Sequence, residues 1–186
     1  MARNSRFVPW LEVLAERALP DATASAGALF ITGDDNPNTV VILDDGAGNV
    51  QVTLDGKAYP VFTGITSITI QTFGGSDTVD YWLTGDLVGR ETVVADLGAK
   101  VDCFTAHVSD RTVAADSRLI IQAFGDGGGD KLALEAQNVS GGPNSFFEVD
   151  LVGGKAKDVL TSNYTPGVVD LTASVAINLQ QRDTKL

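Results

Sequence analysis

Cysteine and histidine are almost absent from this chain of 186 residues, which contains one of each, Cys103 and His107. A lone cysteine excludes a disulfide within the chain. One cysteine and one histidine also leave no zinc site of ordinary composition. The sequence has no uninterrupted run of 18 apolar residues, so it contains no candidate membrane-spanning helix.

Basic residues are also few, 13 against 24 acidic residues, and the formal net charge is −11. A surface of that sign is repelled by phosphate backbones, which argues against nucleic-acid binding. The hydrophobic fraction of 44% is nevertheless high enough for a folded core. Together with 20 glycines and few helix-favouring runs, it predicts an all-β, turn-rich domain preceded by a short extra segment.

Residues 1–26 differ from the rest of the chain. Val8, Leu11, Leu14 and Leu19 recur at roughly helical spacing, and Pro20 would end such a helix. Small residues follow at 22–27 and are typical of a linker. The apolar stretch is too short and too interrupted by glutamates for an ordinary secretory signal. A short amphipathic helix that caps the domain is one interpretation of this segment.

A resemblance gives the other interpretation. The stretch FVPWLEVLAERALPDA resembles the N-terminal segment of many large exported proteins of planctomycete-type bacteria. The matching residues are Leu11, Glu12, Leu14, Glu16, Arg17 and Pro20, whereas Ala15 and Glu16 stand where that family has Glu-Asp. The resemblance covers about 16 residues. It implies that the protein is secreted or placed at the cell surface.

Residues 27–66 contain four short apolar stretches, ALFITG, TVVILDD, NVQVTLDG and YPVFTG. The segments between them, DDNPN, DDGAGN and DGK, have the composition of tight turns. We therefore predict an antiparallel β-meander over 27–66. Its expected role is to cover the open edge of the first repeat, which would otherwise promote aggregation.

A repeat occupies residues 67–180. Five segments begin at Ile68, Val93, Leu119, Phe147 and Val175, at intervals of 25, 26, 28 and 28 residues. Two residues further along stand Ile70, Ala95, Ile121, Val149 and Ile177, and the polar residues that follow them are Gln71, Asp96, Gln122, Asp150 and Asn178. This alternation is that of strands with one buried face. We expect Ile70, Ile121, Val149 and Ile177 to form one continuous buried ladder.

Units of this size cannot bury a core alone, but stacked units can. The repeat therefore predicts a right-handed parallel β-helix or β-roll with four to five rungs of 25–28 residues, followed by a polar tail at 181–186. A β-sandwich is the alternative fold, since spaced strands and turns also suit it.

Each repeat has a glycine-containing turn that ends in Asp77, Asp102, Asp130 or Asp158. These turns resemble, in degenerate form, the hemolysin-type calcium-binding repeat G-G-x-G-x-D-x-U-x. The resemblance covers about 36 residues and implies a calcium site formed by Asp126, Asp130 and Asp158 with Gly128 and Gly154. Such oxygen ligands suit Ca²⁺. In the alternative interpretation each aspartate only closes its turn by bonding to the backbone.

Asp80, Tyr81, Trp82 and Asp86 form an aromatic and acidic cluster after the first turn. Such groups on one face bind sugar in β-helix polysaccharide enzymes, but the interpretation that we favour is an aromatic residue of the repeat ladder beside solvated acids. We expect a non-enzymatic, exported β-solenoid with a structural or adhesive role at a bacterial surface. Its expected partners are surface polysaccharide or another copy of the chain, and calcium is its one candidate cofactor. The alternative is a carbohydrate-active β-helix enzyme, a polysaccharide lyase or hydrolase.

Overall fold

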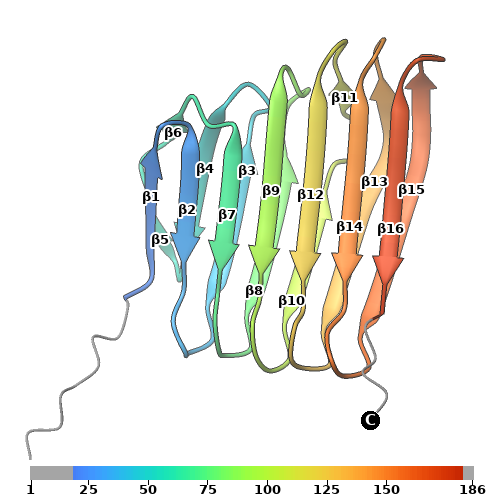
Figure 1. Cartoon of the computed structure of the whole chain (residues 1–186). Coiled ribbons are helices and arrows are strands. Elements are labelled where there is room, and N and C mark those ends of the chain that lie inside the picture. The colour runs from blue at the N-terminus through green and yellow to red at the C-terminus, as the bar shows by residue number, and fades with distance from the viewer. Residues whose placement is uncertain (1–18, 182–186) are drawn as a thin grey trace, which may run out of the picture.

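The computed structural model describes residues 19–181, and every regular element in this range is a β-strand. Figure 1 shows the strands side by side in two layers, with the colour advancing steadily along the stack. The first strands are β1 (Asp21–Ser25), β2 (Ala28–Thr32), β3 (Thr39–Asp44), β4 (Asn49–Leu54), β5 (Lys57–Ala58), β6 (Phe62–Thr63), β7 (Ser67–Gln71) and β8 (Thr78–Leu83). The remaining strands are β9 (Arg90–Asp96), β10 (Cys103–His107), β11 (Thr112–Val113), β12 (Arg118–Phe124), β13 (Lys131–Gly141), β14 (Phe146–Val152), β15 (Val159–Val169) and β16 (Ser174–Gln180).

Two sheets form the walls of a solenoid. Sheet A has seven strands in the order β1-β2-β7-β9-β12-β14-β16. Sheet B has nine, in the order β11-β13-β10-β8-β3-β4-β5, with β15 beside β13 and β6 beside β4. The chain passes repeatedly from sheet A to sheet B, and each strand pairs in parallel with its equivalent one coil later. This confirms the solenoid, because the two sheets of a β-sandwich are antiparallel.

The core lies between the sheets because alternate side chains of every strand point inward. In sheet B the first inward column stands two residues after the last residue of each lower turn, and it runs from Val40 through Val79, Phe104 and Leu132 to Leu160. The first four of these side chains are completely buried. The polar residues predicted on the outer face of sheet A do lie there, and Asp150 accepts hydrogen bonds from Gln122 (3.0 Å) and Asn178 (2.7 Å).

The register between β9 and β12 differs by two residues from the sequence alignment. Val93 pairs with Ile121 and not with Leu119. The column is Ile68, Val93, Ile121, Val149 and Ile177, of which the first four are buried and Ile177, in the last strand, is half-buried. The predicted ladder is therefore wrong at Ile70, which lies in the adjacent column. A shift of two residues keeps every side chain on its own face, so alternation alone cannot detect it. The sequence separation from the turn aspartate does detect it, because each of the first four column members stands nine residues before the aspartate of its own turn.

The solenoid begins earlier than the sequence repeat indicates. Strand β2 pairs in parallel with β7, and β3 pairs in parallel with β8, so residues 28–44 are already a coil. Within the predicted meander at 27–66, antiparallel pairing joins β4, β5 and β6 to the edge beyond β3. This insertion lengthens the first coil, and so its similarity to the later coils is concealed in the sequence.

The segment before the first coil is only partly described. The small residues expected to form a linker include β1, which pairs antiparallel with β2, and Ala22 is buried. That expectation is wrong, because β1 covers the outer edge of sheet A. The predicted helix and its export-type motif lie mainly in residues 1–18, and most of the polar tail lies at 182–186, both outside the described residues. In the part of the chain that is described, no helix could cross a membrane.

We predict that Ile121→Asp lowers the free energy of unfolding by several kcal/mol, because it places an unpaired charge in the centre of the buried column. Urea denaturation measures the loss. The matched control is Ile120→Asp on the outward face of the same strand, which we expect to cost much less. Equal losses for both variants would contradict the assigned faces of β12.

Candidate functional site

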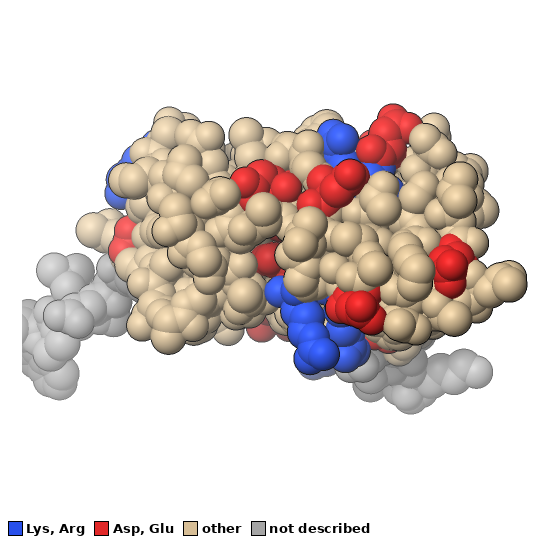
Figure 2. Space-filling model, turned by 90° about the horizontal axis from the view of Figure 1, so that it is seen from above, with Lys and Arg blue, Asp and Glu red and all other residues tan. Residues whose placement is uncertain are grey.

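The two ends of the coils carry different kinds of turn. Figure 2 looks onto the upper turns, where acidic and basic side chains are interspersed on a largely uncharged surface. The turns at the opposite, lower end carry the predicted glycine and aspartate residues. Five of these turns lead from sheet A to sheet B, and each has six residues, at 33–38, 72–77, 97–102, 125–130 and 153–158. The lower end is therefore the natural place to look for a site.

The last residues of these turns stack into a continuous hydrogen-bonded row, here called the carboxylate ladder: Asp77, Asp102, Asp130 and Asp158. The N–H of each aspartate donates to Oδ1 of the next, at 2.8 Å from Asp77 to Asp102, 2.9 Å from Asp102 to Asp130 and 2.8 Å from Asp130 to Asp158. Asn38 begins the row, and its N–H donates to Oδ1 of Asp77 at 2.7 Å. Side chains thus join successive coils where the strand ladders are interrupted by the turns.

The second carboxylate oxygens of the ladder receive few hydrogen bonds to offset their burial. Oδ2 of Asp77, Asp102 and Asp130 is buried without a hydrogen-bond partner. Burial is the main cause that raises the pKa of all three, and that of Asp102 reaches about 6, with the carboxylates of Asp77 and Asp130 adding to the effect. These three carboxyl groups of the ladder therefore hold their protons to a higher pH than an exposed aspartate does.

The predicted calcium ligands lie together, and most of their carboxylate oxygens are already engaged. Asp130 and Asp158 occupy neighbouring positions in the ladder, whereas Asp126 is exposed on the turn before Asp130. Oδ2 of Asp158 accepts hydrogen bonds from Gly154 N–H and from Gln181, both at 2.7 Å. Of the four oxygens of Asp130 and Asp158, only Oδ2 of Asp130 remains without a partner. Ca²⁺ takes six to eight oxygens, so this pair could contribute only to a weak, partly hydrated site.

A steric requirement that does not involve an ion explains the glycines of these turns. A Cβ at Gly128 would overlap the backbone oxygen of Lys100 on the preceding coil. A Cβ at Gly154 would overlap that of Asp126 in the same way. Glycine is required where adjacent turns approach this closely, and so the calcium-like sequence pattern also serves coil stacking.

An exposed row crosses the outer face of sheet B, perpendicular to its strands. We call it the Trp82 row: Leu43, Trp82, His107, Glu135 and Asn163, paired in that order on successive coils. The Trp82 and His107 rings are stacked, with centroids 3.6 Å apart and planes 9° from parallel. His107 Nδ1 lies 2.9 Å from Glu135 Oε2, and its Nε2 lies 3.8 Å from Asp80 Oδ1. His107 is thus a member of a stacked surface row.

The predicted aromatic and acidic cluster divides between three places. Asp80 and Trp82 face outward, whereas Tyr81 points into the core, as the alternation along β8 requires. Asp86 lies on an upper turn, where its Oδ1 accepts the Thr112 N–H at 2.7 Å. The four residues therefore do not share one face, as a sugar-binding cluster would require.

Inside the core, Tyr81 belongs to a buried polar group that includes Asp44 and Glu91. Its hydroxyl donates to Oδ2 of Asp44 at 2.7 Å, while Oε1 of Glu91 has no partner. Burial raises the pKa of Glu91 to about 8, and the charge of Asp44 adds to the effect. Burial also raises the pKa of Asp44. Glu91 therefore stays largely protonated at neutral pH.

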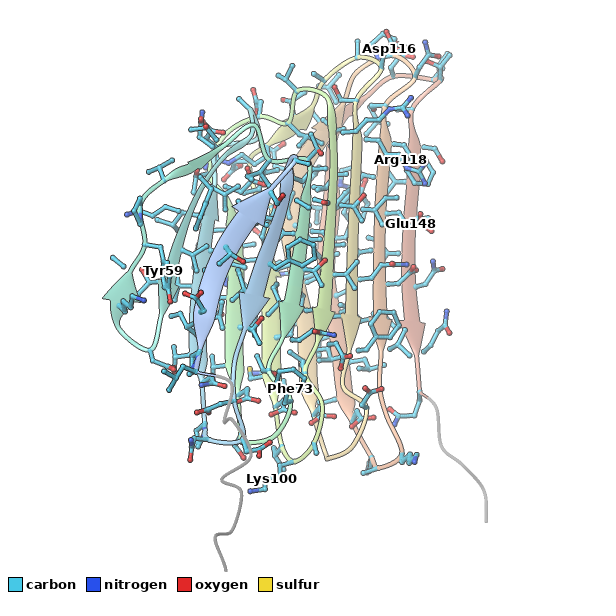
Figure 3. The ribbon with its side chains drawn as sticks, turned by 60° about the vertical axis from the view of Figure 1, so that its left-hand side comes forward. Tyr59, Phe73, Lys100, Asp116, Arg118 and Glu148 are labelled. Atoms are coloured by element: carbon cyan, nitrogen blue, oxygen red, sulfur yellow. The ribbon has the colours of Figure 1, made fainter. Side chains whose placement is uncertain are left out.

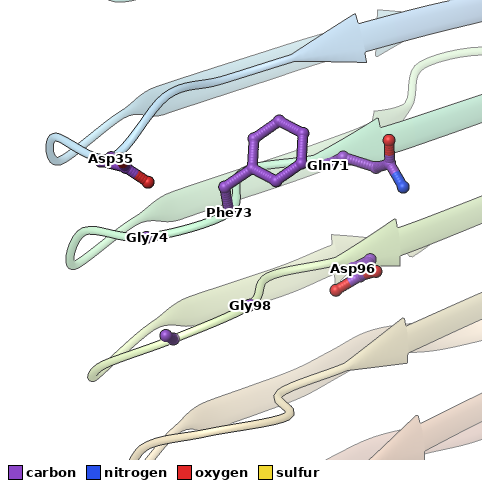
Figure 4. Close-up of a pocket in the computed structure, with 7 residues that line it drawn as sticks. Asp35, Gln71, Phe73, Gly74, Asp96 and Gly98 are labelled. Atoms are coloured by element: carbon purple, nitrogen blue, oxygen red, sulfur yellow. The ribbon is translucent and has the colours of Figure 1, made fainter. Parts of the chain in front are cut away.

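A cleft of about 290 Å³ opens on the outer face of sheet A near the lower turns (Figure 4). This Phe73 cleft is lined by Asp35, Gln71, Phe73, Gly74, Asp96, Gly98 and Ala99. Asp35 comes from the first coil, while Gln71 and Asp96 end β7 and β9. The pKa of Asp96 is raised by burial and by the neighbouring carboxyl of Asp126.

No protein-family model matches the chain, and no curated protein or solved structure matches it at a significant level. The candidate sites therefore have to be judged by their geometry and chemistry.

Sequence reasoning missed Asn38, Glu91 and the Phe73 cleft. The sequence did contain a feature that places Asn38 in the ladder. Asn38 stands nine residues after Leu29, and each ladder aspartate stands nine residues after its own column member. Glu91 also had such a feature, since it occupies an inward position of β9 by the alternation of that strand. The cleft had none, because it joins residues of three coils whose outward positions differ in sequence.

We predict that stability falls as pH rises from about 5 to about 8, because of Glu91. Its pKa is about 8 in the folded chain against an ordinary 4.5, so between these values the folded state holds a proton that the unfolded state has lost. The free energy of unfolding then decreases by up to about 1.4 kcal/mol per pH unit. In urea denaturation, Glu91→Gln should remove this slope between pH 6 and pH 8, whereas below about pH 6 the raised pKa of Asp102 keeps a slope of the same sign.

The matched control is Glu148→Gln, on the outward face of β14, which should keep the wild-type slope. An unchanged slope in Glu91→Gln would show that another group causes the pH dependence.

Proposed function

We propose that the protein is a non-enzymatic β-solenoid module, exported to the bacterial surface, where it has a structural or adhesive role. The carboxylate ladder supports a structural role, because it joins five successive turns into one hydrogen-bonded edge. The export part of the proposal rests on the resemblance of the N-terminal segment alone.

The observation that carries the adhesive part is the Trp82 row. Trp82 and Leu43 are 42% and 41% exposed, and they lie side by side along the axis of the stack. The carboxylates of Asp80 and Glu135 flank the aromatic pair. Apolar surface beside fixed hydrogen-bond acceptors suits sugar rings, whose C–H faces and hydroxyls need both. A linear polysaccharide lying along the row is the partner we propose.

Binding to immobilised bacterial polysaccharides tests this proposal. Trp82→Ala should reduce retention of the protein by about tenfold, because it removes the largest apolar contact of the row. Phe30→Ala is the matched control, since Phe30 is 47% exposed on the outer face of sheet A. Melting curves of both variants establish that each is folded. Equal retention of Trp82→Ala and wild type, or no retention by any polysaccharide, would overturn the assignment.

A carbohydrate-active enzyme is the second candidate function, and one observation favours it. Asp96 and Asp126 are paired carboxyls beside the Phe73 cleft, and the raised pKa of Asp96 suits a proton donor. Paired carboxyls of this kind carry glycoside hydrolysis. Release of reducing ends from the same polysaccharides, lost in Asp96→Asn, would establish this activity and exclude the non-enzymatic proposal.

We further propose a weak calcium site between the turns that end at Asp130 and Asp158, with Asp126 as a third oxygen donor. At ten times a dissociation constant of about 10⁻⁴ to 10⁻³ M, the ion would add about 1.4 kcal/mol of stability. The expected result is a melting shift of a few degrees with 10 mM calcium, absent at matched ionic strength with potassium. Asp130→Asn combined with Asp158→Asn should abolish it. No shift in the wild type would mean that these aspartates serve only the ladder.

A further inference from the structure

The Phe73 cleft is lined by polar groups that take no part in the Trp82 row or in the carboxylate ladder. Its side-chain polar groups are the carboxylates of Asp35 and Asp96 and the amide of Gln71, and no lysine or arginine lines it. Lys100 follows Ala99 in sequence but is not part of the lining. The lining therefore offers no cationic side chain to these two carboxyl groups.

Phe73 supplies an aromatic surface in the same place. Its side chain is 46% exposed, and Figure 4 shows the ring standing out from its turn between the segments that carry Asp35 and Asp96. Its backbone has a φ of +64°, which is uncommon for a bulky residue. The neighbouring coil holds it there, because the Phe73 carbonyl accepts the Ala99 N–H at 2.7 Å. The ring is thus fixed at the cleft and not turned into the core.

Two carboxylates around an exposed aromatic ring select one class of ligand. Carboxylates accept hydrogen bonds and attract positive charge, and the face of an aromatic ring attracts a cation within about 6 Å of its centre. We propose that the Phe73 cleft binds an organic cation, an alkylammonium or alkylguanidinium group. The volume of about 290 Å³ suits one such group and its alkyl stem.

The carboxyl pair at the edge of the cleft strengthens this choice. Burial and the neighbouring carboxyl of Asp126 raise the pKa of Asp96, because negative charges on these two carboxyls would repel each other. A bound cation relieves that repulsion, whereas a neutral ligand does not. The long-range field favours the same ligand, because the net charge of −11 raises the concentration of cations near the surface.

The cation could come from a free polyamine or from a lysine or arginine side chain of a partner protein. The probes that separate these sources are spermidine, n-butylammonium and n-butylguanidinium, each titrated as the chloride at constant ionic strength. Backbone amide chemical shifts of residues 71–74 and 96–99 report binding at the cleft. A preference for n-butylguanidinium would point to arginine, and a preference for spermidine would point to a polyamine.

We expect saturable shifts with the cations and none with n-butanol. Phe73→Ala should weaken binding about fivefold through loss of the cation–π contact. Asp96→Asn should weaken it at least as much, because it removes a charge. The matched controls are Phe30→Ala, on the same face of sheet A, and Asp116→Asn at the opposite end of the coils (Figure 3). Both controls should bind as the wild type does.

Three results would overturn the proposal. One is the absence of saturable shifts with any of the cations. Another is binding that Phe73→Ala and Asp96→Asn leave unchanged, which would indicate general attraction to an acidic surface. The third is saturation of the cleft by a neutral oligosaccharide and not by the cations, which would assign it to the carbohydrate-active alternative. Retention of polysaccharide at the Trp82 row is independent of all three.

Discussion

The hydrogen bond from one turn aspartate to the carboxylate of the next is the interaction on which the stack depends. Parallel strands join the coils along both sheets, but at each lower turn the regular ladders give way to single backbone bonds, such as that from Ala99 N–H to the Phe73 carbonyl. There the N–H of Asp77 would be buried without a partner if Asp102 did not accept it, and the same holds for Asp102 and Asp130. An unpaired buried N–H costs about 1–3 kcal/mol, so every turn relies on its successor.

The same interaction explains how much of the fold could be predicted. Strict alternation in five segments was enough to predict two facing walls, and a constant interval indicated stacked coils. Alternation could not decide between Leu119 and Ile121 as the partner of Val93, because both face inward. The aspartate position decides it, since a two-residue slip would remove Asp130 from the N–H of Asp102. The first coil went unrecognised for two reasons, its inserted strands and the asparagine at position 38.

The candidate sites were predicted less well than the fold. The calcium site implied by the resemblance required Asp130 and Asp158 to lie together, and they do, because they stand one coil apart on the same edge. That their oxygens would be occupied by N–H donors could not be read from residue types alone, since carboxylates serve ions and backbones equally well. The Phe73 cleft depends on a positive φ at a phenylalanine and on close approach of the next coil at Gly98. Neither property has a signature in the order of residues.

The two ends of the coils differ in what they tolerate. Every lower turn has six residues, because one residue more or less would move its aspartate out of reach of the preceding N–H. The upper connections obey no such rule: they span four residues at 142–145, ten at 108–117, and 22 at 45–66, where a whole antiparallel insertion is accommodated. Turn length is therefore fixed at the lower edge by the hydrogen bonds of the ladder, whereas the upper edge accepts connections of different lengths. New loops or epitopes grafted at the upper edge would leave the carboxylate ladder that joins the coils undisturbed.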